Sequence, residues 1–246
     1  MDADRKTALV AGALYIVTFV GSIPALALYH DILKDPNYIL GHASDAGVRV
    51  SALLEIVCAL AGIGTAVVLH RVVKRHAQTR ALGFIASRVW EAAMICVGVM
   101  SVLAIVTLHH DATGASAGSA NSLVGPARAL VALHDWTFLV GPGLAPAISA
   151  MCLASVLYRT RLVPRIIPTL GLIGAPMLVV SSVATLFGVF DQVSSAAFVL
   201  ALPIAVWEFS LGVWMLVKGF RPSPQQPESV PAASRNVGTG LVTATA

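Results

Sequence analysis

Long apolar segments separated by short polar ones make up most of this chain. Six such segments occur, at about residues 8–28, 50–70, 81–108, 129–157, 166–188 and 196–217. Each has the roughly 20 residues that a helix needs to cross a hydrocarbon core of about 30 Å. Because lipid offers the backbone no hydrogen-bond partner, each segment is expected to be α-helical. The pattern predicts an all-α bundle of six transmembrane helices, in which the long third and fourth spans tilt, kink or extend beyond the lipid.

The composition agrees with this pattern. Hydrophobic residues make up 57% of the chain and charged residues 11%, whereas soluble domains carry about 25% charged residues. The first apolar segment follows Arg5 and Lys6 as a secretory signal would, but it is longer than the roughly 7–15 residues of a signal core. We therefore expect a multi-pass protein of the cytoplasmic membrane whose first span is retained.

The basic residues are distributed unequally between the two sides of the predicted bundle. Twelve Lys and Arg residues precede span one, follow span six or lie in the second and fourth connections, whereas Lys34, Arg49 and Arg128 lie on the other side. Because basic loops stay in the cytoplasm, both termini are predicted to be cytoplasmic. The asymmetry also accounts for the net charge of +4. No nucleic-acid partner is therefore expected, and the lipid bilayer with its anionic headgroups is the partner that the charge favours.

The chain divides into a transmembrane domain, residues 1–221, and a tail, residues 222–246. The tail is rich in Pro, Ser and Thr and has almost no apolar clustering. It cannot bury enough surface to order itself, so it is expected to be a disordered cytoplasmic segment. The outer connection at about 109–128 is rich in Ala, Gly and Ser and is expected to be flexible.

The first outer connection, at about 30–49, carries several side chains that can bind metal ions. These are His30, Asp31, Asp35, His42 and Asp45. They lack the close spacing of a metal site, and Asp35-Pro36-Asn37 is a turn signal. We interpret the segment as a solvated loop rather than a metal site.

The main chemical signal is a set of ionisable residues inside the apolar segments. Such residues cost about 2.5–3.5 kcal/mol each on insertion scales, and they often mark functional sites. The predicted topology places them in two layers, an outer one of Glu55, His134 and Asp135 and a deeper one of Arg88, Glu91 and Glu208.

The deeper layer has the spacing of an ion-pair network. Arg88 and Glu91 are three residues apart, so they share one helix face and can pair, and Glu208 can reach Arg88 from a neighbouring helix. Four carboxyl groups face one permanent cation and one histidine in the six-residue set. In a dry interior some carboxyl groups must keep a proton, or water or a cation must enter. The alternatives are a network that only locks helix packing and, for His134 and Asp135, a polar pair near the headgroups.

Two short similarities relate the halves of the chain. Residues 89–91 and 206–208 both read Val-Trp-Glu, and Thr18-Phe19 resembles Thr137-Phe138 at a similar offset. The matched spans run in opposite directions, which is the pattern of a weak three-plus-three inverted repeat, a common plan in secondary transporters. Spans two and five show no match, and coincidence in an apolar chain is the alternative.

Proline and glycine interrupt several spans, above all in Gly-Pro-Gly-Leu-Ala-Pro at residues 141–146. Proline removes a backbone donor and breaks the helical ladder. Such a break can expose carbonyl groups to a ligand, but it is also tolerated where neighbouring groups satisfy the backbone. The second interpretation is preferred here.

Motifs for a cofactor or a metal are absent from the sequence. It contains no Gly-rich phosphate loop, no His-Glu-x-x-His and no Cys-x-x-Cys. Cys58, Cys96 and Cys152 lie inside spans and are interpreted as packing residues rather than disulfide partners. No cofactor and no metal site are therefore expected.

Four stretches carry a resemblance to a known family: 155–174 with its Tyr-Arg and Pro-Arg turn, 207–220, Arg88 with Glu91, and 11–15. They resemble the corresponding parts of bacterial six-span membrane proteins grouped as domain of unknown function 4386. The resemblance covers nearly all of residues 5–221. It implies the six-span topology and draws attention to the deeper polar layer. The family has no assigned reaction, so the resemblance implies no substrate.

Together these patterns predict a small membrane protein with a polar cavity around Arg88, Glu91 and Glu208 that binds or transports a small solute or a proton. A membrane-embedded enzyme acting on a lipid or isoprenoid is the first alternative, with Glu91, Asp135 or Glu208 as general acid. A structural or regulatory membrane subunit is the second. A dry apolar pocket beside one carboxyl group would favour the enzyme, and a fully satisfied network without a cavity would favour the subunit.

Overall fold

A computed structural model describes residues 3–35, 37–41 and 44–221 of the chain. Within these residues the protein is all-helical, without a β-strand. Six spans are long and apolar enough to cross a membrane, which confirms the fold class read from the apolar pattern. The spans are α1 (Ala3–Leu28), α3 (Ala46–Val73), α4 (Gln78–Thr113), α6 (Val124–Val140) continued by α7 (Ala145–Thr160), α8 (Ile166–Leu186) and α9 (Ser195–Val217).

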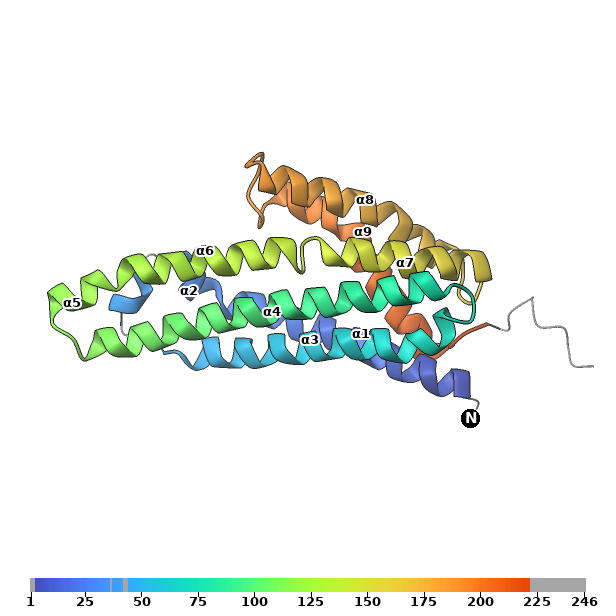
Figure 1. The fold of residues 1–246 in the computed structure, drawn as a ribbon, viewed down its shortest axis with the longest axis horizontal. Helices are drawn as coiled ribbons and strands as arrows, with labels where there is room; N and C mark the ends of the chain where they lie inside the picture. The colour runs from blue at the N-terminus through green and yellow to red at the C-terminus, as the bar shows by residue number, and fades with distance from the viewer. Residues whose placement is uncertain (1–2, 36, 42–43, 222–246) are drawn as a thin grey trace, which may run out of the picture.

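The six spans form a ring in which each packs against two neighbours. α1 lies between α3 and α9, α3 packs on α4, α4 packs on α6 and α7, and α8 joins α7 to α9. Figure 1 shows α8 and α9 leaning away from α6 toward the turn that connects them. The ring therefore surrounds a central space into which all six spans can direct side chains.

The two long spans behave differently. α4 is continuous over 36 residues, or about 54 Å at 1.5 Å per residue, so it extends beyond a hydrocarbon core of about 30 Å. The fourth span instead breaks at 141–144, between α6 and α7. Extension and kinking are both among the outcomes expected for spans of this length.

The predictions for the two outer connections are corrected by the structure. Segment 109–128, expected to be flexible, is mostly helical, because α4 continues to Thr113, α5 covers Ala117–Ser122 and α6 begins at Val124. Alanine is the best helix former, and Ala120 and Ala127 are buried. Composition alone therefore misjudged this segment.

The first outer connection is also more structured than the solvated loop that was expected. It contains α2 (His30–Lys34) and the 3-10 helix η1 (Tyr38–Leu40). Ile32, Tyr38 and Ile39 are buried in a cluster with Val102 and Ile105 of α4. Apolar burial thus holds this segment on the bundle. His42 and the predicted tail, 222–246, lie outside the described residues.

The close approach of α1 and α9 depends on two glycines. A Cβ atom added to Gly12 would come within 2.7 Å of the Gly212 carbonyl oxygen, and one added to Gly212 would come within 2.9 Å of the Tyr15 Cβ. Small residues allow membrane helices to pack backbone to backbone. The contact brings α9 against α1 beside the polar residues in the middle of the bundle.

The start of the first span is bound to the end of the last span. The Arg5 guanidinium donates hydrogen bonds to the carbonyl oxygens of Met215 at 3.0 Å and Leu216 at 2.8 Å. These oxygens belong to the last turn of α9, where a cation both satisfies unpaired carbonyl groups and opposes the negative end of the helix dipole. The start of α1 and the end of α9 are therefore on one side of the bundle.

Candidate functional site

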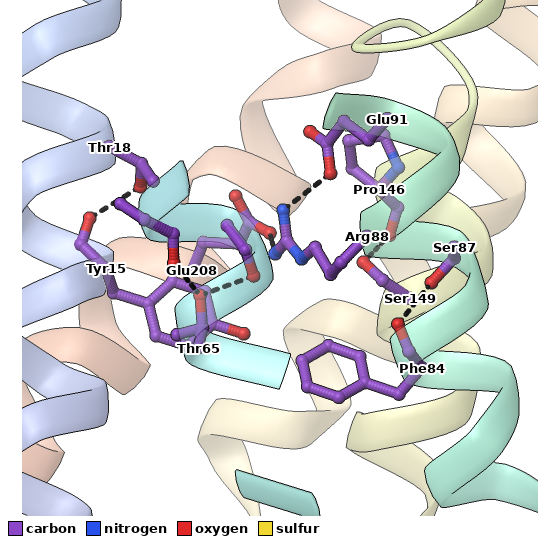
Figure 2. Close-up of polar contacts among 12 residues, drawn as sticks. Tyr15, Thr18, Thr65, Phe84, Ser87, Arg88, Glu91, Pro146, Ser149 and Glu208 are labelled. Carbon is purple, nitrogen blue, oxygen red and sulfur yellow. Dashed lines mark hydrogen bonds and ion pairs between the residues drawn. The ribbon is translucent and has the colours of Figure 1, made fainter. Parts of the chain in front are cut away.

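The deeper polar layer is a buried three-residue ion-pair network. The Arg88 guanidinium on α4 donates one hydrogen bond to Glu91 Oε2 at 2.8 Å and another to Glu208 Oε1 on α9. Figure 2 shows the guanidinium between the two carboxyl groups. The side chain of Arg88 is almost fully buried. The structure thus brings together the three residues that the sequence assigns to this layer.

Aromatic rings complete the surroundings of Arg88. Its guanidinium carbon lies 5.6 Å from the centre of the Tyr15 ring and 5.9 Å from that of the Phe84 ring. At such distances the face of a ring attracts a cation. The Nε atom of Arg88 is buried and has no hydrogen-bond partner among the described residues. The arginine is therefore oriented mainly by its two carboxyl partners and these rings.

Glycine contacts on α8 position Glu208. The ring of Trp207 packs directly on Gly171, where an added Cβ would meet ring carbons at 2.7 Å. One turn earlier on α9, the backbone of Ile204 lies where a Cβ added to Gly174 of α8 would meet it at 2.7 Å. These contacts fix the rotation of α9 about its axis. The carboxyl group that follows Trp207 is thereby directed toward Arg88.

A cavity of about 360 Å³ adjoins this network. Glu55, Arg88, Glu91, His134 and Glu208 all line it, and they come from α3, α4, α6 and α9. Most of the remaining lining consists of apolar and aromatic side chains from α1, α4, α6 and α9. A volume of this size is in the lower part of the range of small-molecule sites, about 300–1,000 Å³.

The outer polar layer is only partly assembled around the cavity. Glu55 and His134 line it, together with Tyr29, which directly follows α1. The His134 ring packs edge-on against Tyr29 at 5.7 Å and is stacked with Phe138 at 6.3 Å. Asp135 is not among the lining residues, and its side chain is 59% exposed. Its one contact with the layer is to His134 Nδ1 at 3.4 Å.

Side chains from neighbouring helices donate hydrogen bonds to backbone carbonyl groups at the break between α6 and α7. The Ser182 hydroxyl donates to the Gly143 carbonyl oxygen at 2.7 Å, and Trp90 Nε1 donates to the Val140 carbonyl oxygen at 3.2 Å. A Cβ at Gly141 would clash with the Met94 Cβ, so glycine also lets α4 approach the break. These contacts support the structural interpretation of residues 141–146, although Pro142 and Pro146 line the cavity.

A second polar cluster lies where α3 begins and α4 ends. The Asp45 carboxylate accepts hydrogen bonds from the Tyr38 hydroxyl at 2.9 Å and His109 Nδ1 at 3.0 Å. The other ring nitrogen of His109 lies 3.2 Å from the Gly41 carbonyl oxygen. Burial and the bond to Asp45 raise the pKa of Tyr38, so its hydroxyl stays a donor. The sequence pattern indicates a solvated loop around Asp45 and gives no sign of its contact with His109, 64 positions away.

Among the described residues, no group of three or more His, Cys, Asp or Glu side chains has a geometry that could hold a metal ion. Cys58, Cys96 and Cys152 are unpaired thiols. Cys58 also lines the cavity, beside Glu55.

A known protein family is similar to this chain over most of its length. The model of a family described as "Domain of unknown function (DUF4386)" matches residues 10–219. No curated protein and no solved structure matches the chain. The matched region contains all six spans, apart from the first residues of α1, and every residue of both polar layers.

Proposed function

The chain belongs to the DUF4386 family, and from its polar cavity we propose that it binds a small solute within the membrane and moves that solute, or a proton, across it. The protein is a multi-pass membrane protein by its six apolar spans. We place it in the cytoplasmic membrane, with both termini in the cytoplasm, because the basic residues gather at the end of the bundle that carries the N-terminus.

The observation that carries this proposal is the position of the buried charges. Arg88, Glu91 and Glu208 border an open volume of about 360 Å³ instead of a dry helix interface. Burying charged groups is costly unless they are paired, and a paired network can often be replaced by apolar side chains without loss of stability. Charges kept beside a cavity are therefore better explained by a ligand or a proton than by packing.

The weak internal repeat supports transport. Glu91 and Glu208 end the two Val-Trp-Glu motifs, and they bind the same guanidinium from α4 and α9. α4 is the third span and α9 the sixth, so the two motifs occupy corresponding positions in the two halves of the chain. Transporters built from inverted repeats place their sites near the midplane, where the repeats meet.

Cysteine accessibility tests the proposal. In a chain with Cys58, Cys96 and Cys152 replaced by Ala, the variant Ala205→Cys places a thiol on the cavity wall. The matched control is Val206→Cys, the next residue, which is outside the lining and exposed on the surface of α9. Membrane vesicles of each orientation are treated with a charged, membrane-impermeant thiosulfonate.

A transporter exposes its cavity to each side in turn. We expect Ala205→Cys to react in both vesicle orientations and Val206→Cys, surrounded by lipid, to react in neither. Reaction from one side only would favour the enzyme. Absence of reaction from both sides would favour the structural subunit.

One observation favours the enzyme as the second candidate. Ile23 and Leu26 of α1 line the cavity and are also exposed on the surface of the bundle. A lipid or isoprenoid could enter there directly from the bilayer. Of the general acids considered for such an enzyme, Glu91 and Glu208 border the cavity, whereas Asp135 does not.

A further inference from the structure

Two polar groups, the Tyr29 hydroxyl and the Glu55 carboxyl group, line the outer part of the cavity. The Tyr29 hydroxyl belongs to a residue that is 1% exposed and makes no well-aligned hydrogen bond with a described residue. The Glu55 carboxyl group is next to this hydroxyl on the cavity wall and interacts with it, but it forms no ion pair with a described residue. Buried polar atoms in proteins nearly always have a partner. Glu55 therefore offers a carboxyl group without an ionic partner to a molecule that enters the cavity.

Charge indicates what kind of molecule this is. Arg88 is the one Lys or Arg side chain among the residues that line the cavity, and it is already bound by Glu91 and Glu208. Glu55 therefore adds a carboxyl group without a permanent counter-charge in the lining; His134 is the nearest basic group. An anion would be repelled by this surface. A cation would supply the counter-charge that Glu55 lacks.

The rings around Glu55 suit an organic cation in particular. Tyr29, His134 and Phe138 form a row, with the middle ring 5.7 Å from the first and 6.3 Å from the last. Phe19 of α1 lines the same cavity. Aromatic faces stabilise ammonium groups, including quaternary ones that cannot donate a hydrogen bond. A small hydrated metal ion would gain little from such walls.

The rest of the lining indicates that the ligand has an apolar body and that it enters the cavity from the lipid. Ile23 and Leu26 border the cavity while being 69% and 47% exposed on the outside of α1. In a bilayer that outside surface contacts acyl chains. A molecule with an apolar body can therefore reach the cavity through the membrane and lead its charged group to Glu55.

On this basis, and resting on the proposed function, we propose that the substrates are hydrophobic organic cations, such as aryl-alkyl amines or quaternary ammonium compounds. The positive nitrogen pairs with the Glu55 carboxylate beside the rings of Tyr29 and His134. The apolar body lies along Phe19, Ile23 and Leu26.

Three probes of similar shape test the charge requirement. They are 4-phenylbutyl-trimethylammonium, its neutral analogue with a tert-butyl group in place of the ammonium, and 4-phenylbutyl-sulfonate. Binding to the full-length protein in nanodiscs is measured by calorimetry. We expect saturable binding of the ammonium compound and at least about tenfold weaker binding of the other two, a difference of about 1.4 kcal/mol. Equal or tighter binding of the sulfonate or the neutral compound would overturn the proposal.

Two variants test the assignment of Glu55. Glu55→Gln removes the charge but keeps a side-chain oxygen beside the Tyr29 hydroxyl, so the protein should keep its melting temperature while its affinity for the ammonium compound falls at least about tenfold. Asp135→Asn removes an acid of similar depth that lies outside the cavity, and affinity should be unchanged. Equal affinity in wild type and Glu55→Gln would refute the assignment.

A failure of the cation proposal can be distinguished from a failure of the transport proposal. If Ala205→Cys reacts from both sides of the membrane but no ammonium compound binds, transport stands and the substrate class is wrong. If the ammonium compound binds through Glu55 but the thiol reacts from one side only, the cation site stands and transport is wrong.

Discussion

Arg88 on α4 and Glu208 on α9 are 120 positions apart in the sequence and form a direct ion pair inside the bundle. The pair joins the last span of each half of the chain beside the cavity. Arg88 holds Glu91 in the same way from within α4. One guanidinium thus compensates two carboxyl groups, and both depend on it.

Replacing Arg88 by Leu should destabilise the protein strongly. The substitution leaves the Glu91 and Glu208 carboxyl groups without a counter-charge, and breaking a buried pair typically costs about 3–5 kcal/mol. The expected result is poor expression or a clearly lower melting temperature in detergent. Arg71→Leu, which changes an exposed arginine at the end of α3, is the matched control. A wild-type melting temperature for Arg88→Leu would contradict the role assigned to the network.

Gly12→Ala should weaken the packing of α1 on α9. The added methyl group would lie 2.7 Å from the Gly212 carbonyl oxygen, so the helices must separate, and Glu208 would shift away from Arg88. Overpacking of this kind typically costs about 1–3 kcal/mol. Thermal unfolding in detergent measures the effect. Gly125→Ala adds the same methyl group in open space and should leave stability unchanged or slightly higher; an equal loss in both variants would show that the close approach is not the cause.

His109→Phe should release the segment around η1. The substitution keeps a ring in place but removes the hydrogen bonds to Asp45 and the Gly41 carbonyl oxygen. Hydrogen exchange at residues 38–41 should become faster, while exchange in the middle of α4 stays slow. His110→Phe changes the exposed neighbour, which makes the longer 3.5 Å contact to Asp45, and should have a smaller effect. Unchanged exchange in His109→Phe would mean that apolar burial alone holds the segment.

The proposed orientation predicts the behaviour of reporter fusions. A reporter active only in the cytoplasm should be active after Arg221, and one active only outside the cytoplasm should be active when inserted in α5 (Ala117–Ser122). The reason is the excess of basic residues at the end of the bundle that carries Arg221. The opposite result for both fusions would invert the topology and exchange the outer and inner ends of the cavity.

The sequence alone was sufficient for the number and approximate limits of the spans, because hydrocarbon thickness sets a minimum length for every crossing helix. It also predicted the pair of Arg88 and Glu91, because a separation of three residues fixes two side chains on one helix face. Both conclusions depend only on local geometry, so no knowledge of the neighbouring helices was needed.

Tertiary structure decided which polar residues meet. Glu55 and His134 line the cavity while Asp135, adjacent to His134, is on the outside, and Asp45 reaches His109 across 64 positions. The spans are apolar on nearly every side, so the periodicity that marks the buried face of a soluble helix is missing. Rotation of each helix is set instead by close contacts such as that of Gly12 with Gly212, which exist only when the helices have packed.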